Sequence, residues 1–380
     1  MSKVYIARCE TYEYEWVEEA IREAIEALGG MGHFVQRGQR VLLKPNLLRS
    51  STPDEAIITH PMVVRAMVTL VQEVGAQAVI GDSPGPPYGV AGMRSLYEKA
   101  GLMAVAEDTG AELIFSSPPV QLPNPSGELV KMIDAMEVVT QVDSIISLPK
   151  LKTHGLTGFT GATKNLFGLV PGLVKMGYHA KLQTAEQFSE MLIDLLQFHK
   201  PVLTVMDAIV GMEGNGPSGG DPRPLGYLLV GEDGIALDLV ATSMVGIAAE
   251  DVAPLRVAMQ RGLCTGDAGD VDVLGVSLDE AFVPDFRPHE AVASADRATM
   301  PTLVRRFLAR QLVTSPRVGP KCVGCGTCVE TCPTGAATMD GKRATIDLSE
   351  CIRCYCCHEM CPENAIVLKR SLIGSLIGRL

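Results

Sequence analysis

The sequence predicts an α/β protein with a mostly parallel sheet and helices on both faces, followed by a small C-terminal α+β domain. Two observations support this. Strand-like apolar runs alternate with helical apolar spacing over about the first 280 residues, a pattern typical of parallel strands joined by helices. The alternation then gives way to two cysteine runs. We expect a large domain over residues 1–284, a linker with a basic amphipathic helix over 285–317, and a small domain over 318–380.

The elements of the large domain follow from apolar spacing and from local start and stop signals. Strands are expected at residues 4–7, 41–43, 78–81, 112–115, 144–148, 202–206 and 227–230. Helices are expected at 16–28, 61–74, 92–99, 184–199, 235–245 and 252–260. Gly29 and Gly30 end the first helix, and Thr59 with Pro61 begins the second. The Gly-rich stretch 155–177 favours a mobile loop that orders over a ligand, with an ordinary crossover as the alternative.

The small domain is defined by two runs of four cysteines with the spacing C-x2-C-x2-C-x3-C, each followed by proline. Three thiolates at two-residue intervals wrap one face of a cubane, and the fourth must come from elsewhere. We assign one [4Fe–4S] cluster to Cys322, Cys325, Cys328 and Cys361. We assign the second to Cys351, Cys354, Cys357 and Cys332. Zinc ribbons use separated pairs, often with His, so zinc fits this spacing less well.

These runs resemble a two-cluster bacterial ferredoxin domain over residues 318–368. The resemblance implies a ferredoxin-like iron–sulfur domain that carries electrons. One departure is Cys356, which stands beside Cys357 within the second run. The matching spacing favours Cys357 as the ligand. Cys356 is then an apolar filler, with a ligand swap or a redox-active thiol as alternatives.

Composition restricts the partners. The chain has 380 residues and a net charge of −11, which disfavours nucleic acid. No apolar stretch approaches the length of a membrane span, and the N-terminal residues do not form a secretion signal. We expect a cytoplasmic, reduced protein. The sequence leaves open a homo-oligomer.

Polar residues directly follow four of the expected strands. They are Lys44 and Asn46, Asp82 and Ser83, the stretch from Lys150 to His154, and Asp207. The carboxyl ends of parallel strands share one edge of a sheet, where ligands of open α/β folds bind. We therefore expect these residues to line one crevice.

That crevice would be rich in cations in an otherwise acidic protein, which favours an anionic carboxylate or phosphate ligand. Lys150, Lys152, His154, His179 and Asp207 are the candidate catalytic residues, with a histidine as proton donor. The candidate ligand-binding residues are Lys44, Asn46, Asp82, Ser83, Lys164, Asn165, Lys175 and Asn215. For each residue alone, a surface lysine or a turn aspartate is the alternative.

Asn215 lies in a G-x-G-x-x-G match at residues 214–219. A dinucleotide site needs a helix that opens on these glycines. Two prolines follow instead, at positions 222 and 224. The pattern therefore favours a bent loop whose backbone N–H groups face an anion.

Six motifs of the large domain carry a second resemblance. They are LLKPN from Leu42, THP from Thr59, GDSPG from Gly81, LPKLKTH from Leu148, TGATKNLFG from Thr160 and MDAIVGMEGNGP from Met206. Together they resemble the domain-of-unknown-function family numbered 362 over about residues 35–250. Members often carry a C-terminal two-cluster module. The resemblance implies that the motif residues line a common site, and it supplies no activity.

The main hypothesis is an iron–sulfur oxidoreductase. An external low-potential donor would reduce two [4Fe–4S] clusters, which reduce an anionic small molecule in the large domain. One alternative is an electron-transfer or assembly subunit that binds a protein partner. Another is metal-dependent phosphoryl or acyl chemistry at Asp82 and Asp207, with the clusters as a redox sensor. The sequence leaves open a further flavin or divalent metal.

Overall fold

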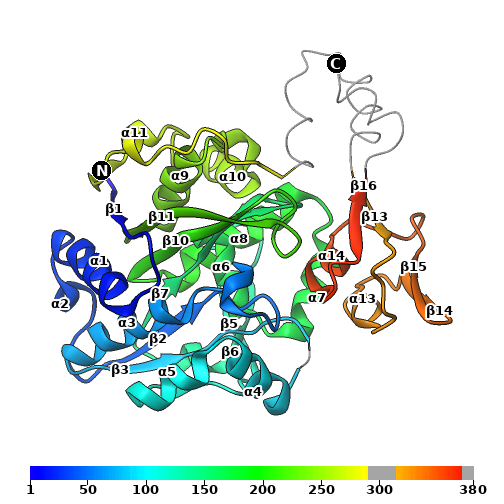
Figure 1. Cartoon of the computed structure of the whole chain (residues 1–380), viewed down its shortest axis with the longest axis horizontal. Coiled ribbons are helices and arrows are strands. Elements are labelled where there is room, and N and C mark those ends of the chain that lie inside the picture. Colours follow the sequence, from blue (N-terminus) through cyan, green and yellow to red (C-terminus); the bar gives the residue numbers. More distant parts are fainter. Residues whose placement is uncertain (87, 290–313, 370–380) are drawn as a thin grey trace.

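The computed structural model describes residues 1–86, 88–289 and 314–369. Most of the expected linker, including the residues 302–312 proposed for its basic helix, lies outside these ranges, as do residues 370–380 at the end of the small domain. The large domain and the cysteine-rich module stand side by side, with helices α7 and α14 at their junction (Figure 1). Within the described ranges, no helix is both long and apolar enough to cross a membrane.

The centre of the large domain is a sheet with the strand order β12-β1-β11-β10-β7-β2-β3-β4. The parallel part comprises β10 (Leu203–Glu213), β7 (Ser144–Leu148), β2 (Arg40–Pro45), β3 (Gln77–Ile80) and β4 (Glu112–Leu113). On the other side, β11 (Asp221–Gly231) pairs antiparallel with β10 and with β1 (Lys3–Arg8), and β1 runs parallel to β12 (Asp272–Gly275). The expected mostly parallel sheet is confirmed.

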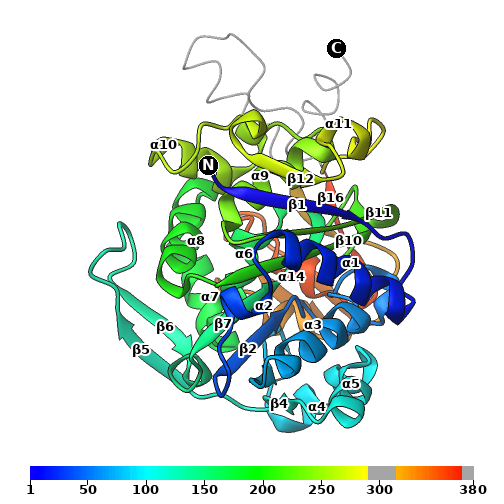
Figure 2. The ribbon, with the colours of Figure 1, turned by 90° about the vertical axis from the view of Figure 1, so that its left-hand side faces the viewer.

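Helices cover both faces of this sheet because its central strands are apolar on both sides (Figure 2). Val41 and Leu43 pack in the core beneath α1 (Tyr14–Ala27) and α3 (Pro61–Glu73). Leu42 points the other way, into the core beneath α9 (Gly234–Met244) and α10 (Ala253–Gln260). This alternation follows from the two-residue period of a strand. Each fully buried Val or Leu contributes roughly 1.5–3 kcal/mol.

The remaining elements of the large domain border the sheet. The helices are α2 (Met31–Phe34), α4 (Val90–Lys99), α5 (Leu102–Thr109), α8 (Ala185–His199) and α11 (Leu278–Ala281). The short 3-10 turns are η1 (Pro53–Glu55), η2 (Glu137–Thr140), η4 (Ala249–Asp251) and η5 (Ala268–Asp270). A hairpin of β5 (Pro119–Pro123) and β6 (Met132–Met136) projects away from the body (Figure 2).

Three local expectations differ from the structure. The Gly-rich stretch is not one loop: it forms β9 (Gly158–Thr160), α6 (Ala162–Asn165), η3 (Leu166–Leu169) and the start of α7 (Gly172–Lys181). The polar stretch after β7 is a buried strand, β8 (Lys150–His154), paired with β10 and β9. Helix α3 is capped by the ring of His60, which accepts from Met62 N, because Thr59 instead bonds Asn46 N and Leu148 O.

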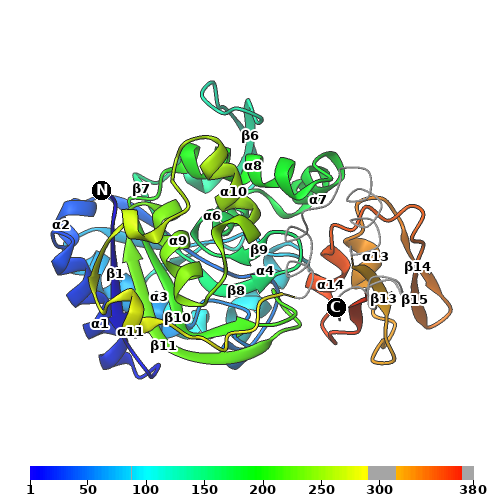
Figure 3. The same cartoon turned by 90° about the horizontal axis from the view of Figure 1, so that it is seen from above.

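The cysteine-rich module is small because its core is built largely around cysteines. Strand β13 (Ser315–Val318) pairs with β16 (Ile366–Lys369), and β14 (Ala337–Asp340) pairs with β15 (Arg343–Ile346). Helices α13 (Thr327–Glu330) and α14 (Cys356–Met360) lie beside them. Figure 3 shows α14 on the side that faces the large domain and the β14–β15 hairpin on the far side.

Candidate functional site between the two domains

The strand ends bring Lys44 and Asp82 together in a buried ion pair. Lys44 Nζ lies 2.8 Å from Asp82 Oδ1, and both side chains are at most 3% exposed. Lys44 also donates to Pro45 O at 2.8 Å and to Asn165 Oδ1 at 3.1 Å. Gly168 lies against the pair, and a Cβ there would overlap both charged groups. Gly168, the second glycine of the TGATKNLFG motif, is therefore required for the close packing of this ion pair.

A cavity of about 100 Å³ opens beside this pair. The large domain lines it with Lys44, Asn46, Asp82, Ser83, Lys164, Asn165, Lys175 and His179. The opposite wall belongs to the module and contains Thr331, Cys356, Glu359 and Met360. Eight of the residues predicted from the sequence thus share one cavity. The module residues were missed, because a rule based on strand ends has no means of identifying a wall that another domain supplies.

Three groups in this cavity are available to a ligand. Within the described residues, Lys164 Nζ forms no hydrogen bond or ion pair, and His179 Nδ1 and Asn46 Oδ1 have no hydrogen-bond partner. Burial lowers the pKa of His179 to about 4, so its ring is neutral at pH 7. The ring stacks on that of Phe188, with 4.5 Å between the ring centroids. An ammonium that forms no direct ion pair, beside unpaired polar atoms, is the chemistry of an anion site.

Lys175 has a different protonation state from an ordinary lysine. Burial lowers its pKa to about 7; the Asp82 carboxylate opposes this shift, and the neighbouring cations Lys44 and Lys164 add to it. Its ammonium donates to Ser83 O. Near pH 7 Lys175 therefore holds its proton about half of the time, which is the property of an effective general acid.

Direct contacts dock the module on the large domain. Arg49 Nη1 donates to Cys361 O at 2.8 Å, and His358 Nε2 lies 3.2 Å from Asn215 O. Asn215 takes part through its backbone: its side chain is exposed and does not line the cavity. Gly85 allows the loop after β3 to approach Met360, because a Cβ there would overlap the sulfur.

His154 contacts the module through Glu359. Its Nδ1 accepts from Leu156 N at 3.0 Å and Thr157 N at 3.3 Å, so this nitrogen carries no proton. Burial lowers the pKa of His154 to about 4. The neutral ring therefore carries its proton on Nε2, which lies 3.1 Å from Glu359 Oε1. Burial opposes ionisation of Glu359, but His154 and the charge of Lys164 outweigh it and lower the pKa of that carboxyl.

Two further cavities, of about 20 Å³ each, lie inside the module. One is lined by Cys322, Cys325, Cys328 and Cys361. The other is lined by Cys332, Cys351, Cys354 and Cys357. All eight are free thiols. Each set of four therefore surrounds one space, and among the described residues no three metal-binding side chains converge on a single ion. Backbone N–H groups reach several sulfurs, including Ala365 N to Cys361 Sγ at 3.1 Å. Four thiols around one space fit a cubane.

Cys356 lies outside both cysteine sets. It is buried, faces Cys354 and lines the cavity between the domains. The contact with Cys354 and burial raise the pKa of this thiol well above its ordinary value. Cys356 is thus a neutral thiol between the second cysteine set and the ligand cavity.

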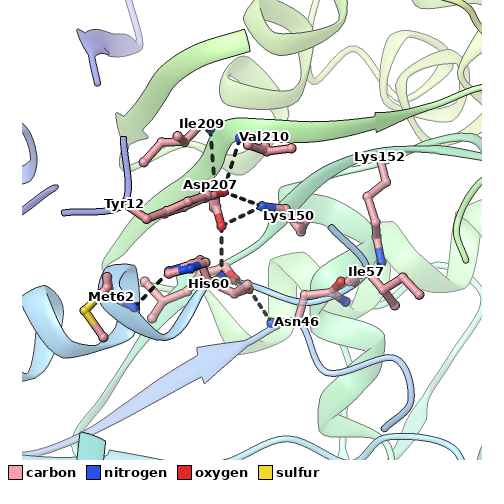
Figure 4. Close-up of polar contacts among 12 residues, drawn as sticks. Tyr12, Asn46, Ile57, His60, Met62, Lys150, Lys152, Asp207, Ile209 and Val210 are labelled. Atoms are coloured by element: carbon pink, nitrogen blue, oxygen red, sulfur yellow. Dashed lines mark hydrogen bonds and ion pairs between the residues drawn. The ribbon is translucent and has the colours of Figure 1, made fainter. Parts of the chain in front are cut away.

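Four of the five predicted catalytic residues do not line this cavity: Lys150, Lys152, His154 and Asp207. Figure 4 shows three of them, Lys150, Lys152 and Asp207. Lys150 Nζ lies 2.8 Å from Asp207 Oδ2 and 2.8 Å from Tyr12 OH. Asp207 also accepts from Tyr12 OH, His60 N and Ile209 N. Lys152 Nζ donates to Ile57 O at 2.7 Å, and burial lowers its pKa well below the ordinary value.

Every polar group of the Lys150–Asp207 pair is satisfied, which favours a structural role; a catalytic role stays a prediction. Asp82 forms an ion pair with Lys44, and Asp207 forms one with Lys150. A divalent ion at either carboxylate would have to displace that lysine.

Comparisons with known proteins agree with this division into two parts. A family model described as a domain of unknown function (DUF362) matches residues 41–243, and one for a 4Fe–4S dicluster domain matches residues 321–365. A thylakoid-associated protein of Synechocystis sp. is 36% identical over 264 residues, which cover 69% of this chain and 79% of that protein.

Two solved structures show weak likeness. A Thermotoga maritima protein has a TM-score of 0.34 and 14% identity over 60% of this chain. The lactate racemase apoprotein of Thermoanaerobacterium thermosaccharolyticum has a TM-score of 0.39 and 11% identity over 63%. The chain spans 57% of the length of each. At these scores the likeness carries no argument about function.

Proposed function

Since this chain belongs to the family of the domain of unknown function DUF362 and carries a 4Fe–4S dicluster domain, we propose that it is an iron–sulfur oxidoreductase. An external low-potential donor supplies electrons to the module. The module passes them to an anionic small molecule bound between the two domains. The capacity for iron–sulfur electron transfer comes with the dicluster domain. The substrate and its reduction are the proposal.

One observation supports this function above the others: a single cavity has lysines on one wall and the cysteine-rich module on the other. The lysine wall can hold an anion. Most of the module wall is α14, which carries Cys357 of the second cysteine set and ends next to Cys361 of the first. A ligand in the cavity therefore lies beside the one helix that carries a cysteine of one proposed cluster and ends next to a cysteine of the other.

The residues of the cavity have distinct roles in the proposed two-electron reduction. When bound, two cubanes supply one electron each. Lys164 binds the carboxylate of the substrate. Lys175 donates one proton, because its pKa lies near 7. A second proton comes from water, so a C=C bond next to the carboxylate gains two electrons and two protons to give CH–CH. His179 is neutral and serves as a polar contact to the ligand. His154 is also neutral and contacts Glu359 of the module, so Lys175 replaces both histidines as the acid.

The experiment is anaerobic turnover with reduced methyl viologen as the electron donor. The protein should carry about eight irons, as two cubanes require. Lys164→Gln should lower anion-dependent reoxidation of the viologen at least tenfold while leaving iron content unchanged. Lys181→Gln is the matched control, because Lys181 is exposed near the end of α7. Equal activity of both variants and the unmodified protein over a panel of unsaturated carboxylates would remove the proposed site.

The cellular location is part of the proposal. Thiols stay reduced in the cytoplasm, where a cubane protein is most readily maintained. The Synechocystis relative is thylakoid-associated, so fractionation of cells into supernatant and membrane pellet is the direct check. Recovery mainly with the membranes would contradict a cytoplasmic location.

A further inference from the structure

A second cavity, of about 230 Å³, lies against the first on the same edge of the sheet. Its walls are the loop after β3, helix α4, the segment after β4 and the start of α7. Six residues line both cavities, including Asp82, Ser83, Tyr88 and Gly172. The two spaces are therefore neighbouring compartments of one site.

The second compartment differs from the first in chemistry. Its inner surface is apolar, with Met93, Ile114, Phe115, Met136 and Val174. Among the described residues, Asp82 is the one charged residue of its lining, and that carboxylate is already paired with Lys44. An anion gains nothing from entering this compartment, whereas an apolar group does.

Tyr88 lies at the boundary of the two compartments, because it lines both. Its ring lies against Gly172, where a Cβ would overlap it. Glycine at position 172 thus makes room for the aromatic ring at this boundary. The shared lining allows one ligand to extend from the first compartment into the second.

The size of the first compartment limits what it can hold alone. A water needs about 10–15 Å³ of such volume, so about 100 Å³ has room for roughly seven to ten water-sized groups. A carboxylate and an adjoining double bond have five heavy atoms and occupy about half of this space or somewhat more. A substituent that adds more than a few carbons must leave toward solvent or enter the second compartment.

We propose that the substrate is an α,β-unsaturated carboxylate with an apolar alkyl or aryl arm. The carboxylate binds at Lys164 and Lys175, the double bond lies beside α14, and the arm occupies the apolar compartment. This inference rests on the proposed function, because it assumes that the lysine wall binds the anion. It goes further by naming the class of acid that the site selects.

Calorimetric titration of the anaerobic full-length protein tests the proposal without turnover. The probes are acrylate, 2-decenoate and cinnamate, with cinnamamide as the neutral counterpart. We expect 2-decenoate or cinnamate to bind at least tenfold tighter than acrylate, and cinnamamide at least tenfold weaker than cinnamate. Val174→Trp should fill the apolar compartment and bring both armed acids to the affinity of acrylate. Val90→Trp is the control, because Val90 is 53% exposed on α4.

The outcomes distinguish failure of the proposed apolar arm from failure of the proposed function. If acrylate binds as tightly as both armed acids, and Lys164→Gln weakens all three, the apolar arm is refuted and the anion site stands. If no acid binds, or Lys164→Gln has no effect on any of them, the proposed function fails as well. The comparison among ligands in the unmodified protein decides the matter even if the Val174 variant does not fold.

Discussion

The buried Lys150–Asp207 pair offers a quantitative test of what these residues do. Asp207→Asn keeps the shape of the side chain and removes the charge that faces Lys150. Both side chains are at most 1% exposed, so the remaining ammonium would have neither water nor a counter-ion. Breaking one partner of such a pair costs about 3–5 kcal/mol. We expect the free energy of unfolding to fall by that amount.

The opposite substitution should cost less. Lys150→Met leaves the Asp207 carboxylate with three donors, Tyr12 OH, His60 N and Ile209 N. The loss is then about 1.5–3 kcal/mol, the range for a hydrogen bond to a charged group. The double variant removes both charges together, and it should be more stable than the sum of the single effects by about 1 kcal/mol or more.

Urea unfolding of the anaerobic protein, followed by circular dichroism, measures these differences. Glu112→Gln is the control, because its ion pair with Arg40 is at the surface and is worth about 1 kcal/mol or less. Additive single effects would refute the pairing. A folded double variant that has lost anion binding more than tenfold would show instead that Lys150 and Asp207 act on the ligand.

Four further outcomes follow from the site. Lys164→Gln should weaken anion binding at least tenfold and lower the free energy of unfolding by about 1 kcal/mol or less, because this lysine forms no hydrogen bond or ion pair within the described residues and acts on Glu359 only through its charge; calorimetry and urea unfolding measure the two effects. Anion affinity should fall as pH rises through about 7, where Lys175 loses its proton, and Lys175→Met should remove most of that pH dependence. Gly168→Ala should separate Lys44 from Asp82 and lower the melting temperature, whereas alanine at the open position Gly177 should not. Cys361→Ala should reduce the iron content by about half, and Cys356→Ala should leave it unchanged; iron assay and EPR distinguish the two.

The sequence predicts the architecture of the large domain well, because its signals are local and repeated. Alternating apolar runs specified a mostly parallel sheet, and β2, β3 and β7 formed where expected. Polar residues after these strands did converge on one edge, as Lys44 and Asp82 show. The spacing of the cysteines also specified which of them line each small cavity.

The parts that failed depend on contacts distant in the sequence. The sequence placed Lys150 and Lys152 in a loop after the strand at 144–148. In the structure, Pro149 is followed by another buried strand, which pairs with β10. Nothing near Lys150 in the sequence reveals that Asp207 and Tyr12 neutralise it. The module wall, with Glu359 and Met360, exists only because α14 packs against the large domain. A carboxylate between two cysteine ligands was the one available signal, and it is a weak one.

Helix α14 connects the binding of iron in the module to the shape of the ligand cavity between the domains. Its five residues, Cys356–Met360, are too few to hold a helix without outside support. Cys357 anchors one side, and Glu359 and Met360 close the cavity on the other. Oxidative loss of iron would release the anchor and thereby open the cavity. Exposure to air should thus abolish ligand capture together with electron supply, which calorimetry on samples before and after brief aeration would register.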